Sequence, residues 1–417
     1  MSLTIRDPLW NNIRVDPLAE ALIDTGPFQR LRYVRQLGHA YLVYPGATHS
    51  RFEHALGTYH LARRTLSLID ERGELGPVDR RACDILQAAA LLHDIGHYPF
   101  SHALEEIGAL HHEQAALPIL TSGPLADALR GQLGHTAPDD VYALMRGSSE
   151  SPLQGLISGS LDLDKIEYLK RDALMCGVPY GEVDVDRLLH ALVLVADPET
   201  GRPAIGVAEK GLAALESLLF AKYQMYRNVY WHHAVRSATA MYKRLVDDAL
   251  RAGELDADEL VRLTDEGVLH RLEARSPAPL LVALRERRLH KRALDLPASE
   301  LDEQWGEWIA NDHARATALE DAMAAELGLN PGDLLVDYPT KPQMLGLDIP
   351  LRTRDGAVSR LTTEGLASAI NLPALSAQLY RSARRLRVFV ARDAGVDETW
   401  LLERISAGDR ESGIGNA

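Results

Sequence analysis

The sequence predicts a mostly α-helical fold that contains one β-hairpin and ends in a small α+β lobe. Apolar residues recur at helical spacing over 51–72 and 82–92, which is the pattern of helices that bury one face. Between 192 and 207 this rhythm stops. Two short apolar runs there flank the turn-forming stretch 197–201, as in a β-hairpin. Strand-like runs return after residue 331.

These patterns divide the chain into three parts. A chain of 417 residues is long enough for two lobes, or for one large helical body with an appendage. We expect a helical body over residues 1–330, a small α+β lobe over 331–407 and a loose tail over 408–417. The sequence contains no internal repeat and no low-complexity run.

Short elements precede two long helices in the first part of the body. We expect a short extended segment over 6–10, helices over 17–24 and 27–37, and a strand or loop over 38–48. Ser50 is a favoured N-cap residue, so the helix over 51–72 begins after it. Pro99 interrupts the helical stretch that follows 82–92, and Ser101 can cap the next helix.

The second part of the chain begins with one long helix over 212–252 that is unusually rich in aromatic residues. Helical segments continue over 254–330. In the lobe, Pro373 is at a favoured first-turn position and predicts a helix that runs to about residue 385. The strand-like runs around it are 334–336, 345–351 and 386–390.

Composition limits the class of protein. The chain has 46% hydrophobic and 25% charged residues, which is typical of a globular protein. Its net charge of −14 argues against nucleic acid as the main partner, although a local basic pocket can still hold a small anion. Cys83 and Cys176 form no disulfide framework and fit a reducing cytosol. No targeting segment or membrane-length apolar run is present, so we expect a cytoplasmic protein.

Residues of the types that ligate metals occur in four segments. His93 and Asp94 end an apolar helix, and His54 lies on the helix before it. The other two segments are the group His97, His102, Glu105 and His112, and the single residue Asp164. A buried helix with a few hydrogen-bonded histidines is the alternative interpretation. The occurrence of all four segments in this order favours a site.

Imidazole nitrogens and carboxylate oxygens together make a mixed site that suits Mn, Fe, Ni or Zn better than Ca. Such a metal leaves positions open for water and substrate, polarises a phosphoryl oxygen and lowers the pKa of bound water. A histidine outside the ligand set can give a proton to a leaving oxygen. Glu105 lies three residues after His102 and can orient its ring.

The ordered series His54, His93-Asp94 and Asp164 resembles the signature of the HD-domain metal-dependent phosphohydrolases. The finer match is to the branch of the SAM-and-HD-domain deoxynucleoside triphosphate triphosphohydrolases. It rests on the stretches 24–25, 28–32, 36–38, 45–47, 51–54, 99–102, 112–114 and 162–165. The resemblance covers residues 5–235 densely and the remainder loosely. No added SAM domain is visible in the sequence.

The resemblance implies roles for the polar cluster. His54, His93, Asp94 and Asp164 would bind one divalent metal. His97, His102 and His112 would surround the α-phosphate, with His102 as the acid for the leaving 5′ oxygen. The family has Asp where this chain has Glu105, whose longer arm keeps the contact to His102 only with a small shift.

The resemblance also implies a substrate site. Arg51 and Lys165 match phosphate-binding positions, and Lys222 stands where the family has an Arg, so charge is kept and bidentate geometry is lost. The remaining matches, around the phosphate and sugar, are Gln36, Leu37, Tyr168, Asp172 and Tyr230. An apolar Leu and an aromatic floor leave no room for a 2′-hydroxyl, which favours deoxynucleotides. Aromatic residues at such positions are otherwise more often part of the core.

A regulatory nucleotide site at a subunit interface is a further property of the family. Asp24, Gln29 and Arg32 match the residues that read a guanine base there. The default interpretation of these side chains is a solvated helix face. Leu3-Thr4 stand near the position where the family has a basic residue. The resemblance thus implies an activating nucleotide and a homo-oligomer, either a dimer or a tetramer.

Three functions are consistent with the sequence. The first is a metal-dependent hydrolase that converts a deoxynucleoside triphosphate and water into deoxynucleoside and triphosphate, with Mg or Mn on the triphosphate. The second is an HD-type phosphodiesterase or nucleotidase that acts on other phosphate esters. The third is a nucleotide-responsive regulator without turnover. The group of positive residues Arg51, Lys165 and Lys222 favours a polyphosphate substrate.

Overall fold

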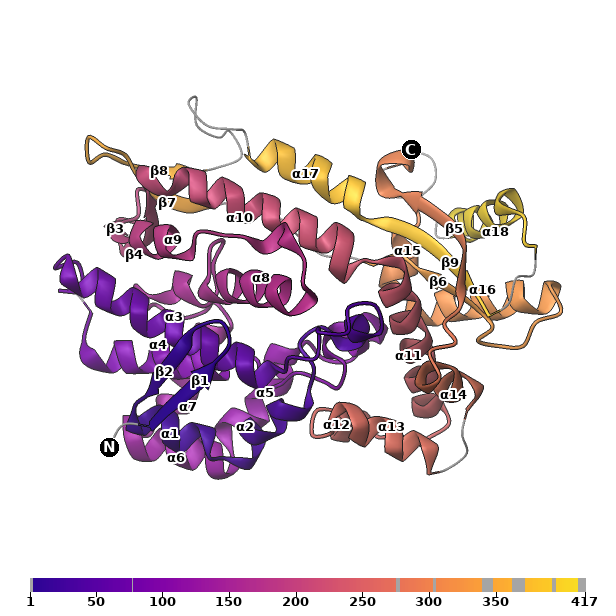
Figure 1. Ribbon diagram of the computed structural model, residues 1–417, viewed down its shortest axis with the longest axis horizontal. Helices are drawn as coiled ribbons and strands as arrows, with labels where there is room; N and C mark the ends of the chain where they lie inside the picture. The colour runs from indigo at the N-terminus through magenta and orange to yellow at the C-terminus, as the bar shows by residue number, and fades with distance from the viewer. Residues whose placement is uncertain are drawn as a thin grey trace.

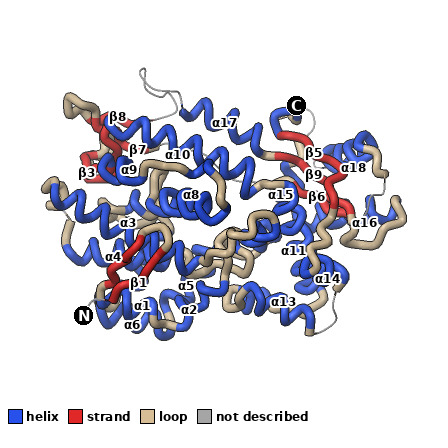
Figure 2. Tube along the Cα trace, in the orientation of Figure 1, coloured by secondary structure: helices blue, strands red, loops and turns tan. Residues whose placement is uncertain are grey.

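The computed structural model describes residues 3–76, 78–274, 278–302, 305–339, 348–361, 372–391 and 395–411. Most of these residues are helical, as the sequence predicts, and the strands form three small sheets (Figure 2). None of the described helices is long and apolar enough to cross a membrane.

The first half of the chain forms a helical body at the lower left of Figure 1. Its helices are α1 (Pro17–Ile23), α2 (Gly26–Arg30), α3 (Arg51–Glu71), α4 (Arg80–Leu92), α5 (His112–Thr121), α6 (Gly123–Leu133), α7 (Ala137–Met145) and α8 (Leu163–Cys176). An antiparallel pair, β1 (Leu3–Asp7) and β2 (Asn11–Val15), precedes them. The α3 and α4 helices pack on each other, and α8 packs on α3.

Capping residues fix where the functional helices begin. The backbone N–H and hydroxyl of Ser50 both bond to Glu53, three residues into α3, in a capping box. Asp162 accepts a hydrogen bond from the backbone N–H of Lys165 and begins α8. The predicted start of the helix after Ser50 is therefore confirmed.

Several first-half segments differ from the helices or strands that the sequence predicts. Within the strand or loop expected over 38–48, residues 38–42 form a 3-10 helix and the rest is turn and irregular backbone. Helix α4 does not continue to His97. It ends at Leu92, and the chain forms turns and irregular backbone over 93–100. Phe100, and not Ser101, precedes the next element, a 3-10 helix over Ser101–Ile107.

The predicted long helix over 212–252 is interrupted. It consists of α10 (Leu212–Met225), a π-helical turn over Tyr226–Tyr230 and α11 (His233–Arg251). A π turn accommodates one extra residue per turn, so the helix direction changes where aromatic side chains gather. Trp231 and His232 then separate the two helices, and the His232 ring accepts a hydrogen bond from the backbone N–H of Ala234.

The predicted β-hairpin is confirmed, and it belongs to a larger sheet. Strands β3 (Leu192–Ala196) and β4 (Pro203–Ala208) follow α9 (Val185–Ala191) and pair antiparallel. Strand β7 (Ile349–Arg352) pairs parallel to β4, and β8 (Val358–Leu361) pairs antiparallel to β7. The sheet order is β3-β4-β7-β8.

The predicted boundary at residue 330 does not separate two structural lobes. Residues 291–297, expected to be helical, form β5 (Lys291–Pro297) because they pair with β9 (Arg385–Val390), which also pairs with β6 (Leu334–Asp337). Meanwhile β7 and β8 join the hairpin at the opposite end of the molecule (Figure 1). The C-terminal segment therefore contributes to two sheets.

Helices surround these sheets. They are α12 (Ala257–Leu260), α13 (Asp265–Glu273), α14 (Pro279–Arg285), α15 (Glu307–Asn311), α16 (His313–Glu326), α17 (Leu372–Ala383) and α18 (Glu398–Glu411). The predicted tail from residue 408 is wrong at its start, because α18 continues to Glu411 and buries Leu401 and Ile405. Part of the predicted strand over 345–351 lies outside the described residues.

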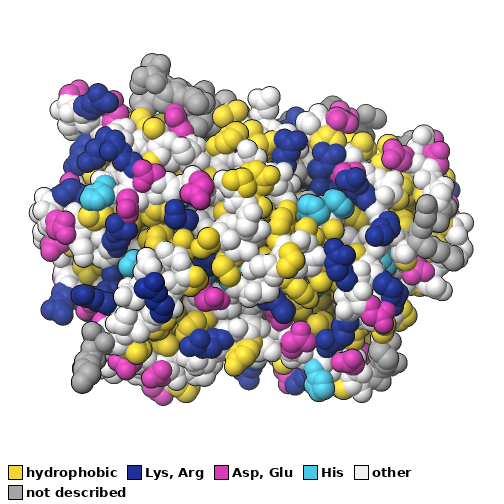
Figure 3. All heavy atoms as spheres, viewed as in Figure 1, with side chains coloured by type: hydrophobic (Ala, Val, Ile, Leu, Met, Phe, Trp, Pro, Cys, Tyr) yellow, Lys and Arg dark blue, Asp and Glu magenta, His cyan; other side chains and the backbone are white. Residues whose placement is uncertain are grey.

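Buried apolar residues form three main clusters: one around α3 and α4, one around α11 and α13, and one on the β5-β9-β6 sheet. On the face in Figure 3, basic and acidic side chains are interspersed, and apolar side chains gather near the middle. The first two clusters meet along a large cavity.

Candidate active site

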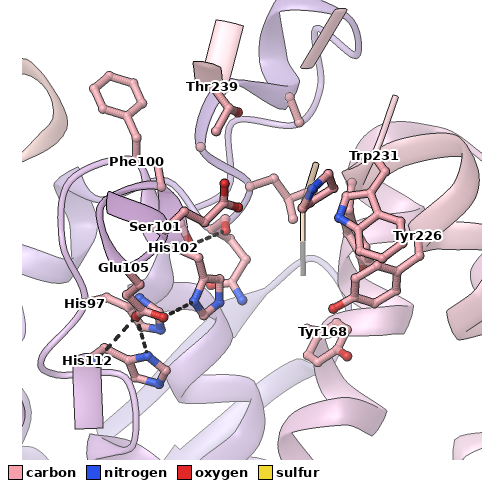
Figure 4. Close-up of a pocket in the computed structure, with 18 of the residues that line it drawn as sticks. His97, Phe100, Ser101, His102, Glu105, His112, Tyr168, Tyr226, Trp231 and Thr239 are labelled. Carbon is pink, nitrogen blue, oxygen red and sulfur yellow. Dashed lines mark hydrogen bonds and ion pairs between the residues drawn. The ribbon is translucent and has the colours of Figure 1, made fainter. Parts of the chain in front are cut away.

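A cavity of about 1070 Å³ lies between the two halves of the protein. Its lining comes from α3, the turn after α4 and α8 on one side, and from α10 and α11 on the other. Figure 4 shows a histidine-rich side that includes His102 and His112, and an aromatic side that includes Tyr168, Tyr226 and Trp231.

The four residues that the resemblance implies as metal ligands lie together beside this cavity. The Nε2 atom of His54 is 3.1 Å from Nε2 of His93 and 3.0 Å from Oδ1 of Asp164. His93 Nε2 is 3.6 Å from the same oxygen of Asp164. The carboxylate of Asp94 lies 3.5 Å from His93 and 3.6 Å from His54. Atoms from α3, the end of α4 and α8 therefore converge.

These separations fit a single divalent cation. Two ligand atoms about 2.1 Å from a metal, at an angle of roughly 90–110°, lie about 3.0–3.4 Å apart. His54, His93 and Asp164 each offer a ligand atom within 4.8 Å of the others. Two imidazoles with carboxylates are also a donor set that suits Mn, Fe, Ni or Zn.

Electrostatics favour positive charge at the same place. Burial alone lowers the pKa of His54, but hydrogen bonds to Asp164 and Glu167 outweigh burial and raise that pKa to about 10. The pKa of His93 is also raised, because Asp94 and Asp164 outweigh its burial. Acidic groups that stabilise a proton on an imidazole also stabilise a cation among the imidazoles.

Glu167 fixes the orientation of His54 from behind. Its Oε2 lies 2.6 Å from Nδ1 of His54, so the Nε2 atom is left to face His93 and Asp164. Its other oxygen accepts hydrogen bonds from Arg171 at 2.7 Å and from the indole N–H of Trp10 at 2.9 Å. Gly57, one turn after His54, makes room for this carboxylate, because a Cβ there would lie 2.0 Å from Oε1.

The turn after α4 carries His97 into contact with α5. Gly96 allows this approach, because a Cβ there would lie 2.1 Å from the backbone oxygen of His112. The rings of His97 and His112 stack with centroids 3.8 Å apart. His97 Nε2 lies 3.1 Å from Oδ1 of Asp94. Burial and the nearby Arg51 guanidinium hold the pKa of His97 well below its usual range, which favours a neutral ring.

Glu105 joins the remaining histidines. Its two oxygens lie 3.2 Å from Nδ1 of His102 and 2.8 Å from Nδ1 of His112. Burial tends to raise the pKa of Glu105, but these hydrogen bonds hold it well below its usual range. Glu105 is therefore an anion that orients both rings. The His102 side chain is 58% exposed and lines the cavity.

This second histidine group is better suited to proton transfer than to a metal. Its four members also offer ligand atoms within 4.8 Å of one another. However, the stacked rings of His97 and His112 are inclined by only 15°, so their in-plane lone pairs run nearly parallel and do not converge on one ion. Glu105 already accepts hydrogen bonds from the rings of His102 and His112.

Basic side chains line the cavity near His54, His93, Asp94 and Asp164, which we call the metal-ligand group. The Arg51 guanidinium contacts the Asp94 carboxylate and the Ser101 hydroxyl. The Lys165 ammonium contacts Asp162 and the carbonyl of Gly159. Lys222 on α10 is buried and lines the same cavity. The structure therefore brings the three predicted phosphate-binding cations to one cavity.

The predicted sugar-binding residues lie nearby. Gln36 and Leu37 line the cavity beside the turn after α4, and Tyr168 and Asp172 line it from α8. The Tyr230 hydroxyl donates a hydrogen bond to Oδ2 of Asp172 at 2.7 Å. His49 was not singled out from the sequence, yet its Nε2 lies 2.7 Å from the other oxygen of Asp172.

The predicted regulatory residues lie away from this cavity. Arg32 is exposed, bonds to Oε1 of Gln29 at 2.7 Å and covers the ring of Phe52 with its guanidinium 3.5 Å from the ring centroid. Gln29 donates to the carbonyl of Ile23, and Asp24 is exposed at the end of α1. Nucleotide binding by this surface stays a prediction.

Sequence reasoning missed Glu167, His49 and a group of charged residues at the far end of the cavity. Glu167 stands three residues after Asp164 on α8, and this helical spacing was a usable signal. The far group has no local signal, because it joins Glu106 to Arg236 and Lys243, more than a hundred residues later. Asp337 also bonds to Arg236 there.

Comparisons with known proteins place the chain in a family. Residues 51–159 match the HD domain, and residues 183–399 match the HD associated region. The first match contains His54, His93 and Asp94. Asp164 lies between the two matches, on α8. The second match alone covers more than half of the chain.

An uncharacterized protein of Methanocaldococcus jannaschii is 33% identical over 345 residues, which are 82% of this chain and 70% of that protein. The deoxynucleoside triphosphate triphosphohydrolase SAMHD1 of Bos taurus is 29% identical over 297 residues, which are 62% of this chain and 48% of that enzyme. The chain thus spans about half the length of the bovine relative.

Solved structures show the same fold. A phosphohydrolase from Bacteroides thetaiotaomicron superimposes with a TM-score of 0.73 at 22% identity, and the match covers 94% of this chain and 100% of that chain. The family resemblance that the sequence implies is therefore confirmed. The chain belongs to the HD-domain phosphohydrolases that carry an HD associated region.

Proposed function

We propose that this phosphohydrolase converts a deoxynucleoside triphosphate and water into deoxynucleoside and inorganic triphosphate. The observation that carries the proposal is the convergence of three groups on one cavity. They are the metal-ligand group around His54 and His93, the proton-transfer pair His102–Glu105, and the sugar-side pair Tyr230–Asp172.

His54, His93, Asp94 and Asp164 would hold the divalent cation. Such a cation supplies Lewis-acid chemistry, because it polarises a phosphoryl oxygen and lowers the pKa of water. The protein residues keep its ligands in place: Glu167 bonds to His54, and the backbone carbonyl of Ala90 bonds to Nδ1 of His93 at 2.9 Å.

Arg51, Lys165 and Lys222 bind and align the triphosphate. Arg51 pairs with Asp94, and Lys165 pairs with Asp162. Neither cation is therefore buried without a partner, which would be costly. Aligned phosphates put the α-phosphorus beside the His97–His112 pair. Electrostatic stabilisation of charge that develops on phosphoryl oxygens is the main contribution of such residues.

His102 provides the proton for the leaving group. Water adds to the α-phosphorus, the bond between that phosphorus and the 5′ oxygen breaks, and the 5′ oxygen takes the proton from Nε2 of His102. Glu105 accepts a hydrogen bond from the opposite ring nitrogen and so orients the ring for this transfer. The oxygen of the attacking water remains in the triphosphate product, and the proton that the water releases replaces the one that His102 gave.

The sugar side supports a deoxynucleoside. Tyr230 and Asp172 are joined by their 2.7 Å hydrogen bond, and Leu37 presents an apolar surface to the cavity. A hydroxyl pressed against an apolar side chain loses its hydrogen bonds with water. The SAMHD1 relatives, whose names give deoxynucleoside triphosphates as substrate, support the same class of substrate.

Product analysis tests the proposal. The purified full-length chain is incubated with each of the four deoxynucleoside triphosphates and each ribonucleotide, with Mn, Mg, Fe, Ni or Zn, in water enriched in ¹⁸O. We expect free deoxynucleoside and triphosphate by mass spectrometry, with the ¹⁸O in triphosphate. A label in the nucleoside contradicts attack at phosphorus. Orthophosphate or monophosphate as the product favours the alternative HD-type phosphodiesterase or nucleotidase.

His93→Ala and His190→Ala form a matched pair for the metal requirement. His93 belongs to the metal-ligand group, whereas His190 is exposed on α9. We expect His93→Ala to lose bound metal and hydrolysis together, and His190→Ala to keep both. Hydrolysis by metal-free His93→Ala protein contradicts the proposed metal site.

Activation and assembly are tested in the same assay. If Asp24, Gln29 and Arg32 bind a guanine nucleotide, adding GTP or dGTP increases the initial rate with a second substrate. Arg32→Ala then abolishes the increase. Size-exclusion chromatography with light scattering measures whether the nucleotide also shifts the chain to a dimer or tetramer.

A further inference from the structure

A strained turn links the metal-ligand group to His102. Phe100 has φ 57° and ψ 28°, and Ser101 has φ 70°, so two consecutive residues with side chains adopt the left-handed conformation. This conformation is unfavourable for residues with a Cβ atom. It persists where the surrounding contacts hold it in place.

Asp265 provides such a contact from a distant part of the chain. It is the first residue of α13 and is 2% exposed. Its Oδ1 accepts the backbone N–H of Phe100 at 2.7 Å, and its Oδ2 accepts the backbone N–H of Arg35 at 3.0 Å. The Arg35 guanidinium lies 3.4 Å from the same Oδ2. One buried carboxylate thus holds two loops that border the cavity.

The Asp265 carboxylate does not cap its own helix. Thr264 performs that role, because its hydroxyl accepts the backbone N–H of Gly267 at 3.1 Å. The hydrogen-bonding capacity of Asp265 is directed away from α13 and toward the turn. A purely local role in helix formation therefore does not explain this buried acid.

The turn controls two groups of the proposed reaction. The Ser101 hydroxyl contacts Arg51 and donates to the backbone carbonyl of Gln36 at 3.1 Å. His102 follows directly in the chain, so its backbone position depends on the same turn. A change at Phe100 therefore moves Arg51 and His102 together.

Arg30 reinforces the same loop from the other side. Its guanidinium donates to the backbone carbonyls of Ile95 and His97, at 3.1 and 2.8 Å, and to that of Leu263 at 2.8 Å. Leu263 lies two residues before Asp265. Residues 263–265 are thus joined to the loop over 95–100 at two places: through Arg30 near Ile95 and His97, and through Asp265 at Phe100.

We propose that Asp265 is a positioning residue for hydrolysis: it holds the Phe100–Ser101 turn in the conformation that aligns Arg51 and His102. The proposal rests on the proposed function for its catalytic consequence, but the hydrogen bond to Phe100 can be measured without any substrate. Asp265 contacts none of the four proposed metal ligands, so we expect its variants to keep bound metal.

The test compares Asp265→Ala and Asp265→Asn with Glu266→Gln in the full-length chain. Glu266 is the next residue, is exposed, and carries the same charge. Hydrogen–deuterium exchange is measured for the peptide over 96–104, which contains the Phe100 amide, and for a peptide that contains the Arg35 amide. Metal content, kcat and KM for a deoxynucleoside triphosphate are measured on the same preparations.

In Asp265→Ala we expect faster exchange confined to residues 35 and 96–104, unchanged metal content, and a kcat lowered by at least about tenfold with a smaller change in KM. Asp265→Asn is intermediate, because its amide oxygen can accept from Phe100 while its NH2 group opposes the N–H of Arg35. Glu266→Gln matches the wild type. If the Ala variant does not fold, the Asn variant carries the test.

Unchanged exchange over 96–104 in both Asp265 variants overturns the proposal. Faster exchange throughout the protein, or an equal loss of kcat in Glu266→Gln, also overturns it. If the wild type hydrolyses no deoxynucleoside triphosphate, the proposed function fails, while the exchange comparison still decides whether Asp265 holds the turn.

Discussion

The Nδ1 atom of His54 lies 2.6 Å from Oε2 of Glu167, and both side chains are fully buried. This contact determines which ring nitrogen faces His93 and Asp164. Glu167 is itself held by Arg171, which pairs with Asp7 at 3.0 Å. The metal-ligand group is therefore anchored to the N-terminal strand pair through a chain of buried charges.

Glu167→Gln should weaken metal binding about 10–100-fold, because a neutral amide orients the ring of His54 less firmly and lowers its basicity. Competition with a chelator measures the affinity. Asp172→Asn is the control, since Asp172 lies on the same helix and bonds to His49, which is not a proposed ligand. Equal metal affinity in Glu167→Gln and the wild type contradicts the role of this contact.

His102→Ala should lower kcat about 10²–10⁴-fold while metal content stays unchanged, because only the proton donor is removed. Single-turnover kinetics with a deoxynucleoside triphosphate measure the chemical step. His135→Ala is the matched control: His135 is exposed between α6 and α7. A rate within threefold of wild type for His102→Ala would assign the proton to another group.

Leu37→Ala should weaken discrimination against ribonucleotides. The smaller side chain opens space for a 2′-hydroxyl, and a change of this size in an apolar pocket alters specificity about 10-fold or more. The ratio of kcat/KM for dGTP and GTP measures it. Leu42→Ala, a similar truncation on the same segment but outside the cavity lining, should leave the ratio unchanged.

His39 should make the protein sensitive to acid. Its ring is 4% exposed and stacks on Phe100 with centroids 4.2 Å apart. Burial, with a smaller contribution from the positive charge of Arg35, lowers the pKa of His39 from 6.5 to about 3. Between these values the unfolded chain binds a proton that the folded protein does not, so the free energy of unfolding decreases as pH falls from 6.5 to 3.

His39→Phe removes this titration and keeps an aromatic ring against Phe100. We expect the stability difference between wild type and variant to change by about 1.4 kcal/mol per pH unit across that window, and to be constant above it. Urea unfolding at several pH values measures it. Parallel pH profiles for the two proteins would show that His39 does not titrate in this way.

The helices with strong local signals could be predicted from the sequence. Ser50 marks the start of α3, where the structure shows its capping box with Glu53. The order of His54, His93, Asp94 and Asp164 was sufficient to recognise the family, and the four side chains lie together in the structure. Their convergence follows from the packing of α3 against α4 and α8.

Elements that depend on distant partners could not be predicted in this way. Strand β5 is stabilised by β9, almost a hundred residues later, so its own seven residues carry little evidence of strand structure. The contact between Asp265 and the Phe100 amide has the same origin. No local pattern distinguishes a buried Asp that binds another loop from one at the exposed start of a helix.

The cavity takes its hydrolytic residues from one half of the chain and much of its remaining wall, including Lys222, Tyr230 and Trp231, from the other. Under the proposed function, substitutions along α10 and the π turn change which nucleotide the cavity accepts and leave the proposed metal ligands and proton donor untouched.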